Sequence, residues 1–88
     1  MPNDLSFEAL CSRYPELQRA HLKEVELRKR YDVVAEIAHK VSFDDPSYAS
    51  RHAKRRQAWL DVERQRGFVV GLTWKLRDQE RAHLVTST

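Results

Sequence analysis

The chain has 88 residues, with 16 lysines and arginines against 13 aspartates and glutamates, so its net charge is +3. Hydrophobic residues make up 41% and charged residues 33%, a balance too apolar for a disordered chain, and the length favours one small domain, residues 1–88. Two glycines and three prolines are too few for a loop-rich or all-β fold, and the single cysteine, Cys11, excludes an internal disulfide.

The sequence carries no signal for a membrane or for export. Its first residues lack the basic and apolar regions of a signal peptide, and the most apolar run, Phe68 to Trp74, is far too short to cross a bilayer. We therefore predict a soluble, cytoplasmic protein with no membrane partner. The charge is uneven, because residues 1–50 hold seven basic and nine acidic residues whereas residues 51–88 hold nine and four. This asymmetry favours an acidic partner.

A short helix is predicted over residues 5–13, because Asp4 can cap it and Pro15 ends it. Its apolar residues are three or four positions apart and form one stripe, which consists of Phe7, Leu10, Cys11 and Tyr14. On this stripe, Cys11 is expected to be a small buried hydrophobe rather than a nucleophile.

A long helix is predicted from residue 15 to about residue 41, followed by a hinge of residues 42–45. One apolar stripe, interrupted only by Glu24, follows the helical period and consists of Ala20, Leu27, Tyr31, Val34, Ala38 and Val41. A narrower apolar strip beside it consists of Leu22, Val33 and Ile37. The remaining positions alternate in charge, as is typical of a solvated face.

The hinge contains two adjacent aspartates. Pro46 suits the first turn of a helix and pushes the preceding residue out of the helical conformation, so Asp45 is expected to be the N-cap of the next helix. The alternative is Asp44 as the cap, with Phe43 and Tyr48 in contact as a hydrophobic staple. In both cases the carboxylates are interpreted as capping groups at a positive helix end rather than as a catalytic pair.

A second long helix is predicted over residues 46–83, followed by a tail of residues 84–88. Gly67 follows two arginines, as residues at helix ends do, but the apolar pattern continues in phase beyond it. We therefore predict one helix, with a kink near Gly67 as the alternative. Apolar alternation over residues 68–76 would also fit a β-strand, but the sequence holds no second convincing strand to pair with it.

The short hinge predicts that the two long helices form an antiparallel hairpin, in which residues equally distant from the hinge meet. With the short helix, this gives an all-α fold, a small helical bundle. The stripe of the second long helix that we place against the first consists of Ala49, Ala53, Leu60, Gly67 and Gly71, whose small side chains would let the helices approach closely. Leu27 is then expected to face Leu60, and Ala20 to face Gly67.

A further apolar stripe of the second long helix is then expected to face outward. Together with part of the narrower strip, it forms the candidate partner-binding surface, which consists of Val62, Val69, Leu72, Trp74, Leu76, Leu22 and Ile37. So much apolar surface in water predicts binding to another protein with an acidic or mixed apolar surface, or pairing with a second copy as a homodimer. The alternative is that Phe7, Leu10 and Tyr14 of the short helix, level with residues 73–82, cover the far end of this surface and give a compact three-element bundle.

A basic patch follows the hinge and consists of Arg51, Lys54, Arg55 and Arg56. Such a patch can hold the phosphates of nucleic acid, or it can be the solvated start of a helix. Its position near a helix N-terminus, where the helix dipole disfavours cations, favours a binding role.

The sequence contains no phosphate-binding glycine loop, no hydrolase nucleophile motif and no paired-histidine zinc motif. His39 and His52 are expected to approach each other near the hinge, but as residues of a polar face and not as a metal site. We therefore predict a non-enzymatic protein without metal or cofactor that binds another protein. An adaptor, a chaperone, a regulator, or a small inhibitor or anti-activator from a phage or mobile element fits this description. The alternative is a basic helical nucleic-acid-binding regulator.

Overall fold

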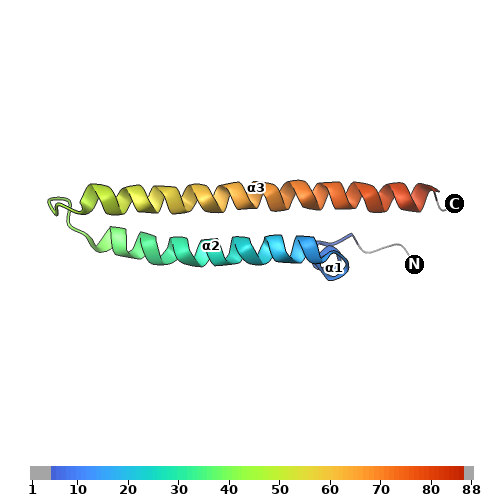
Figure 1. The fold of residues 1–88 in the computed structure, drawn as a ribbon, viewed down its shortest axis with the longest axis horizontal. Helices are drawn as coiled ribbons and strands as arrows, with labels where there is room; N and C mark the ends of the chain where they lie inside the picture. Colours follow the sequence, from blue (N-terminus) through green and yellow to red (C-terminus); the bar gives the residue numbers. More distant parts are fainter. Residues whose placement is uncertain (1–4, 87–88) are drawn as a thin grey trace.

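The computed structural model describes residues 5–86, and the regular structure in this range is entirely helical. Helix α1 spans Phe7–Arg13, α2 spans Pro15–Lys40 and α3 spans Tyr48–Thr86. Helices α2 and α3 lie side by side and antiparallel, and α1 lies at the N-terminal end of α2 (Figure 1). The molecule is a rod with extents of 67 × 16 × 16 Å. The prediction of an all-α fold is confirmed.

Helix α1 begins two residues later than predicted and has a different cap. The Ser6 hydroxyl accepts a hydrogen bond from the backbone N–H of Ala9 at 3.3 Å, which satisfies one free donor of the first turn. The predicted cap, Asp4, lies outside the described residues. At the other end, Tyr14 separates α1 from α2 in an extended conformation, and Pro15 is the first residue of α2.

The expectation that Asp45 is the N-cap of a helix from residue 46 is wrong, because α3 begins at Tyr48. Ser47 directly precedes the helix, and its carbonyl accepts a hydrogen bond from the backbone N–H of Arg51 at 2.9 Å. One carboxylate oxygen of Asp45 accepts hydrogen bonds from the backbone N–H and the hydroxyl of Ser47, at 2.8 and 2.7 Å, and these bonds hold the pKa of Asp45 below its usual value. The ring of Phe43 contacts that of Tyr48 at a centroid distance of 5.4 Å, so the contact expected for a staple is present as well.

Helix α3 continues without interruption through Gly67 and extends to Thr86, beyond the predicted end at His83 (Figure 1). Residues 68–76 are helical, so the strand considered for this region is absent, and α3 runs straight through Gly67 without the kink (Figure 1). Over the described residues, no helix combines enough length and apolar character to cross a membrane.

The face that α2 turns toward α3 is the face that the sequence predicts. Ala20 and Ala38 are buried there, and the rest of the predicted stripe is half-buried, namely Leu27, Tyr31, Val34 and Val41. Contacts across the pair join residues at similar distances from the loop: Gln65 donates to the carbonyl of Ala20 at 2.9 Å, and the rings of Tyr31 and Trp59 are 5.1 Å apart.

The face of α3 that packs against α2 is not the one that the sequence predicts. Val62 and Leu76, expected to face outward, are only 0% and 2% exposed, whereas Leu60, expected against Leu27, is 54% exposed. Gly67 is also exposed, and a Cβ added to it would meet no atom within 4 Å. The helix is thus turned by roughly half a turn from the predicted orientation. The reason is that valine and leucine remove more apolar area from water than alanine and glycine do.

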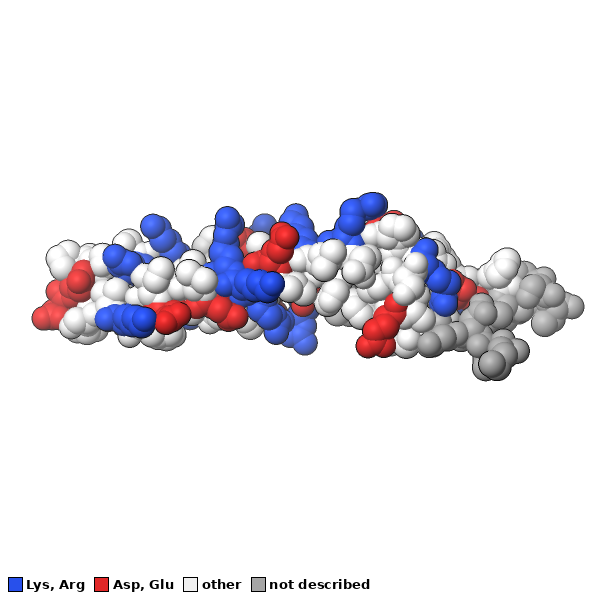
Figure 2. Space-filling model, turned by 90° about the horizontal axis from the view of Figure 1, so that it is seen from below, with Lys and Arg blue, Asp and Glu red and all other residues white. Residues whose placement is uncertain are grey.

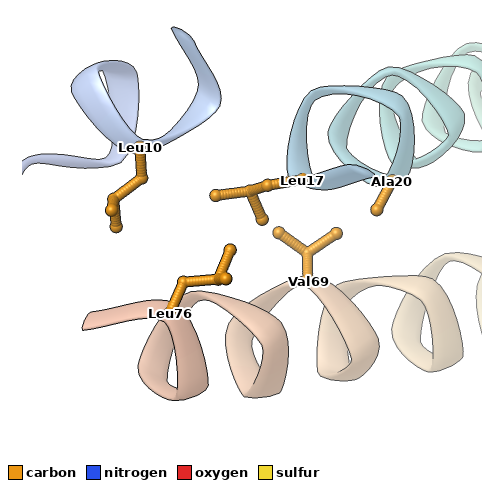
Figure 3. Close-up of a cluster of buried hydrophobic side chains, with 5 residues drawn as sticks. All are labelled: Leu10, Leu17, Ala20, Val69 and Leu76. Atoms are coloured by element: carbon orange, nitrogen blue, oxygen red, sulfur yellow. The ribbon is translucent and has the colours of Figure 1, made fainter. Parts of the chain in front are cut away.

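The best-packed part of the core lies where all three helices meet (Figure 3). Its buried side chains converge from α1, α2 and α3 and are those of Leu10, Leu17, Ala20, Val69 and Leu76. Half-buried Phe7, Cys11, Tyr14 and Leu72 pack around them. Helix α1 therefore covers the inner face of α3 where α3 extends beyond α2.

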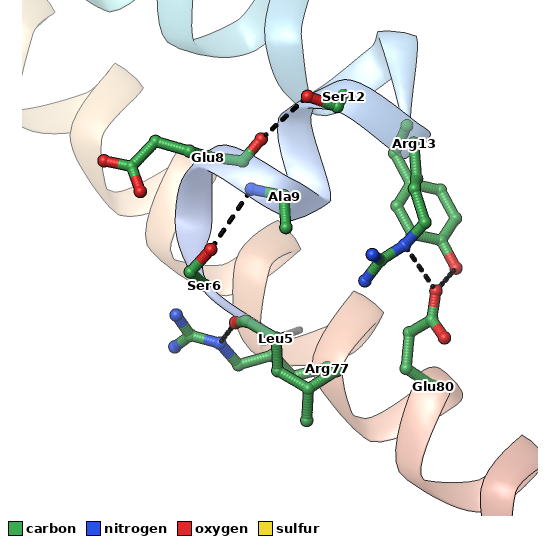
Figure 4. A network of polar contacts seen from close by, with 9 residues as sticks. Leu5, Ser6, Glu8, Ala9, Ser12, Arg13, Arg77 and Glu80 are labelled. Atoms are coloured by element: carbon green, nitrogen blue, oxygen red, sulfur yellow. Dashed lines mark hydrogen bonds and ion pairs between the residues drawn. The ribbon is translucent and has the colours of Figure 1, made fainter. Parts of the chain in front are cut away.

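Polar contacts attach this end of the molecule to α3 (Figure 4). One oxygen of Glu80 accepts hydrogen bonds from the hydroxyl of Tyr14 at 2.8 Å and from Nε of Arg13 at 3.2 Å. The bond to Glu80 raises the pKa of Tyr14, because ionisation would remove the donated proton and place two negative charges together. On the other side of α1, Arg77 donates to the carbonyl of Leu5 at 2.9 Å.

Candidate partner-binding groove

The residues predicted to bind a partner do not form one surface. Val62, Val69 and Leu76 are buried and Leu72 is half-buried, all within the packing between helices. Their expected outward position is therefore wrong, because α3 buries its larger apolar stripe. The other three are exposed, but Trp74 lies on α3 whereas Leu22 and Ile37 lie on α2.

A groove runs along one side of the line where α2 meets α3. It consists of hollows at successive positions along the two helices. Three of them share lining residues, among them Ala20, Lys23, Leu27, Arg30, Asp61, Arg64 and Gln65. The fourth, nearer the loop, shares none with them and is lined by Val34, Ile37, Ser47, Ser50, Arg51 and Lys54. Lys23, Arg30 and Ile37 are seven residues apart, which places them on one side of α2. The hollow nearest the loop has a volume of about 340 Å³.

The floor of the groove is apolar. Leu27 and Val34 are half-buried there, and Ile37 is 44% exposed. These side chains remain partly in water because two helices in contact cover only the strip between them. A further apolar element laid in the groove would remove the remaining area from solvent.

The rims of the groove are rich in cations, contributed by Arg19, Lys23 and Arg30 from α2 and by Arg51, Lys54 and Arg64 from α3. Three carboxylates, those of Glu16, Glu26 and Asp61, line the same hollows. Within the described part of the chain, none of these cations forms an ion pair with a carboxylate; the nearby pairs join Glu24 to Arg28 and Glu36 to Lys40 instead.

Cations are numerous on the α2 side of the molecule. Figure 2 views the rod from the side of α2 and shows lysine and arginine side chains gathered around its middle, with fewer carboxylates among them. In the groove, Arg51 donates to the hydroxyl of Ser47 at 2.9 Å, and Asp61 accepts from Gln57 at 3.1 Å. The electrostatic character of the groove is therefore positive over an apolar floor.

The four residues of the predicted basic patch point to different sides of α3. Arg51 and Lys54 line the groove, whereas Arg55 is half-buried, with its Nε donating to Nδ1 of His52 at 3.3 Å. Arg56 is one residue further on, about 100° around the helix, on the side away from the groove. Only two of the four cations thus line the groove. Lys23 and Arg30 of α2, which were expected on a solvated face, line it as well.

The structure also places the residues considered for metal binding or catalysis. The rings of His39 and His52 are 5.8 Å apart, but residues 5–86 contain no group of three or more side chains that could hold a metal ion. Cys11 is half-buried beside α2, and burial, reinforced by the charge of Glu8, raises the pKa of its thiol. A raised pKa keeps the sulfur protonated and makes it a weaker nucleophile.

Sequence reasoning missed the groove because its parts were assigned to different places. Leu27 and Val34 were placed in the contact between helices, and Lys23 was placed on a solvated face. A usable signal was present, since Lys23 and Arg30 are spaced seven residues apart beside the apolar stripe of α2. The chain matches no protein-family profile, no curated protein and no solved structure. Functional inference therefore depends on the geometry of the molecule itself.

Proposed function

We propose that this chain is a non-enzymatic protein that binds another protein through the groove between α2 and α3. The observation that supports this is an apolar floor of Leu27, Val34 and Ile37, left partly in water between two helices. Burying such a floor against a partner is favourable by about 25 cal/mol for each Å² removed from water. An adaptor, a chaperone or a small inhibitor would act by this kind of contact.

The partner in this proposal is a different protein rather than a second copy. The sequence suggested a homodimer because Val62, Val69, Leu72 and Leu76 were expected to lie outside, and these residues are instead packed within the fold. Binding to nucleic acid is the second candidate function. The cations on the rims of the groove favour it, since each phosphate contact releases counterions.

Site-specific photo-cross-linking in the native host tests the proposal. A benzophenone amino acid is placed at Ile37, in the groove, or at Asp32, which is exposed about 140° away around α2 and lines none of the hollows that form the groove. The proposal predicts a protein adduct of defined mass from position 37 and none from position 32. Identical adducts from both positions, or adducts to nucleic acid alone, would contradict it.

A further inference from the structure

We propose that the partner segment is an acidic amphipathic α-helix, which lies in the groove and completes a three-helix arrangement with α2 and α3. This inference rests on the proposed function and names the chemistry of the partner. It follows from the length of the groove, its charge and the way in which α1 already packs at the other end of the rod.

The length of the groove suits a single helix. The part of the groove that runs along α2 from Ala20 to Ile37 corresponds to about 25 Å at 1.5 Å per residue. A helix of about 17 residues covers this distance, and its apolar residues at every third or fourth position would meet Leu27, Val34 and Ile37.

The charge of the groove selects the residues that flank the apolar stripe of the partner. In a three-helix arrangement the positions beside the buried stripe come close to the rims of the neighbouring helices. Here the rims carry Lys23 and Arg30 on one side and Lys54 and Arg64 on the other, none of them paired with a carboxylate within the described residues. Glutamate or aspartate at these flanking positions would be attracted, whereas lysine would be repelled.

An apolar floor distinguishes this partner from a nucleic acid. Grooves that hold single strands combine cations with aromatic side chains on which bases stack. Along this groove the floor is aliphatic, and the one aromatic residue in its lining is Phe68, at the end away from the loop. Exposed Trp59 and Trp74 line none of the hollows that form the groove.

Helix α1 shows that α2 and α3 accept a third helix in this way. Its Leu10 is completely buried against Leu17 and Leu76, and the flanking Arg13 bonds to Glu80 of α3 (Figures 3 and 4). The contact of α1 with α2 involves Gln18 and His21, which lie on the opposite side of α2 from Lys23. The groove thus lies on the side of α2 opposite to the one that α1 contacts.

The test uses synthetic probes and the full-length protein. Two helical peptides of about 18 residues share one leucine stripe, and the positions flanking it are glutamate in one and lysine in the other. A single-stranded oligonucleotide is the third probe. Each is labelled, and its binding is measured by fluorescence anisotropy at low and at physiological salt.

Two protein variants with equal net charge separate the groove from the rest of the surface. The groove variant combines Lys23→Glu with Lys54→Glu, on opposite rims, and the control combines Arg56→Glu with Arg66→Glu. All four side chains are exposed, and none takes part in a hydrogen bond or ion pair within the described residues. Both variants should therefore keep the circular dichroism spectrum of the native protein.

The native protein is expected to bind the glutamate peptide more tightly than the lysine peptide. The groove variant should lose about tenfold or more in affinity for the glutamate peptide, while the control variant should lose much less. Equal binding of both peptides would overturn the acidic partner but leave the proposed protein-binding function standing. Binding of the oligonucleotide alone, weakened by the groove variant, would overturn both in favour of nucleic acid, and no binding of any probe would overturn both outright.

Discussion

The two ends of the rod differ in what they bury. At the end that contains α1, the large side chains of Leu10, Leu17 and Leu76 are almost completely buried among three helices. Toward the loop, where only α2 and α3 are present, the buried residues between 27 and 58 are the alanines Ala35, Ala38 and Ala58. Two helices in contact fully cover side chains on the line between them, as they do Val62, but a leucine or isoleucine beside that line stays partly in water unless a third element covers it.

This difference explains why the groove lies toward the loop. Val34 stays half-buried and Ile37 is 44% exposed there, although both are as apolar as the residues buried at the other end. The α1 end therefore buries the larger apolar side chains, and the loop end presents the groove in which we propose that a partner binds. Three pairs of substitutions can break or sharpen this comparison.

The largest effect is expected from a charge placed in the three-helix core. Leu76→Glu puts a carboxylate at a site that is 2% exposed, and we expect it to destabilise the protein by about 4 kcal/mol or more. Trp74→Glu, two residues away on α3 and 57% exposed, should change stability by about 0.5 kcal/mol or less. Urea unfolding followed by circular dichroism measures both. Similar losses for the two variants would show that α3 does not have the rotation described.

A smaller effect compares the same change at the two ends. Leu17→Ala should cost about 2–5 kcal/mol, because it removes a fully buried side chain and leaves a cavity. Leu27→Ala removes a half-buried side chain from the groove and should cost about 1 kcal/mol. The measurement is the same urea titration, carried out on both variants. If Leu27→Ala cost as much as Leu17→Ala, the groove would be a closed part of the core.

The smallest effect concerns the hydrogen bonds from Ser47 to Asp45 in the loop. Because hydrogen bonds from Ser47 lower the pKa of Asp45 in the folded state, its contribution to stability is present above its unfolded value of about 3.8 and is lost as the pH falls below it. Asp45→Ala should reduce stability at pH 7 by less than Leu27→Ala does, and the reduction should disappear in acid.

Asp45→Asn is the matched control, since the amide keeps an acceptor for Ser47 but does not titrate at this position. Thermal melts at pH 7 and pH 3 give the comparison. A difference between the native protein and Asp45→Ala that is as large at pH 3 as at pH 7 would argue against a role for the ionised carboxylate.

The sequence by itself determined the elements of this protein and one of the two packed faces. Apolar spacing, prolines and capping residues placed the helices to within a few residues, and the single continuous stripe of α2 predicted which side of it meets α3. These features are local, because they depend on residues within a few turns of one another. The same local rules placed Leu10 and Tyr14 on the packed side of α1.

Only the tertiary structure decided the rotation of α3, and with it the groove. Helix α3 carries apolar residues on two sides, Leu60 and Gly67 on one and Val62 and Val69 on the other, so its periodicity fits two orientations equally well. The choice between them depends on the total apolar area buried against both α1 and α2, which no single segment contains. Once α3 is turned that way, Arg51 and Lys54 border the groove while Arg56, adjacent in sequence to Arg55, is carried around to the other side.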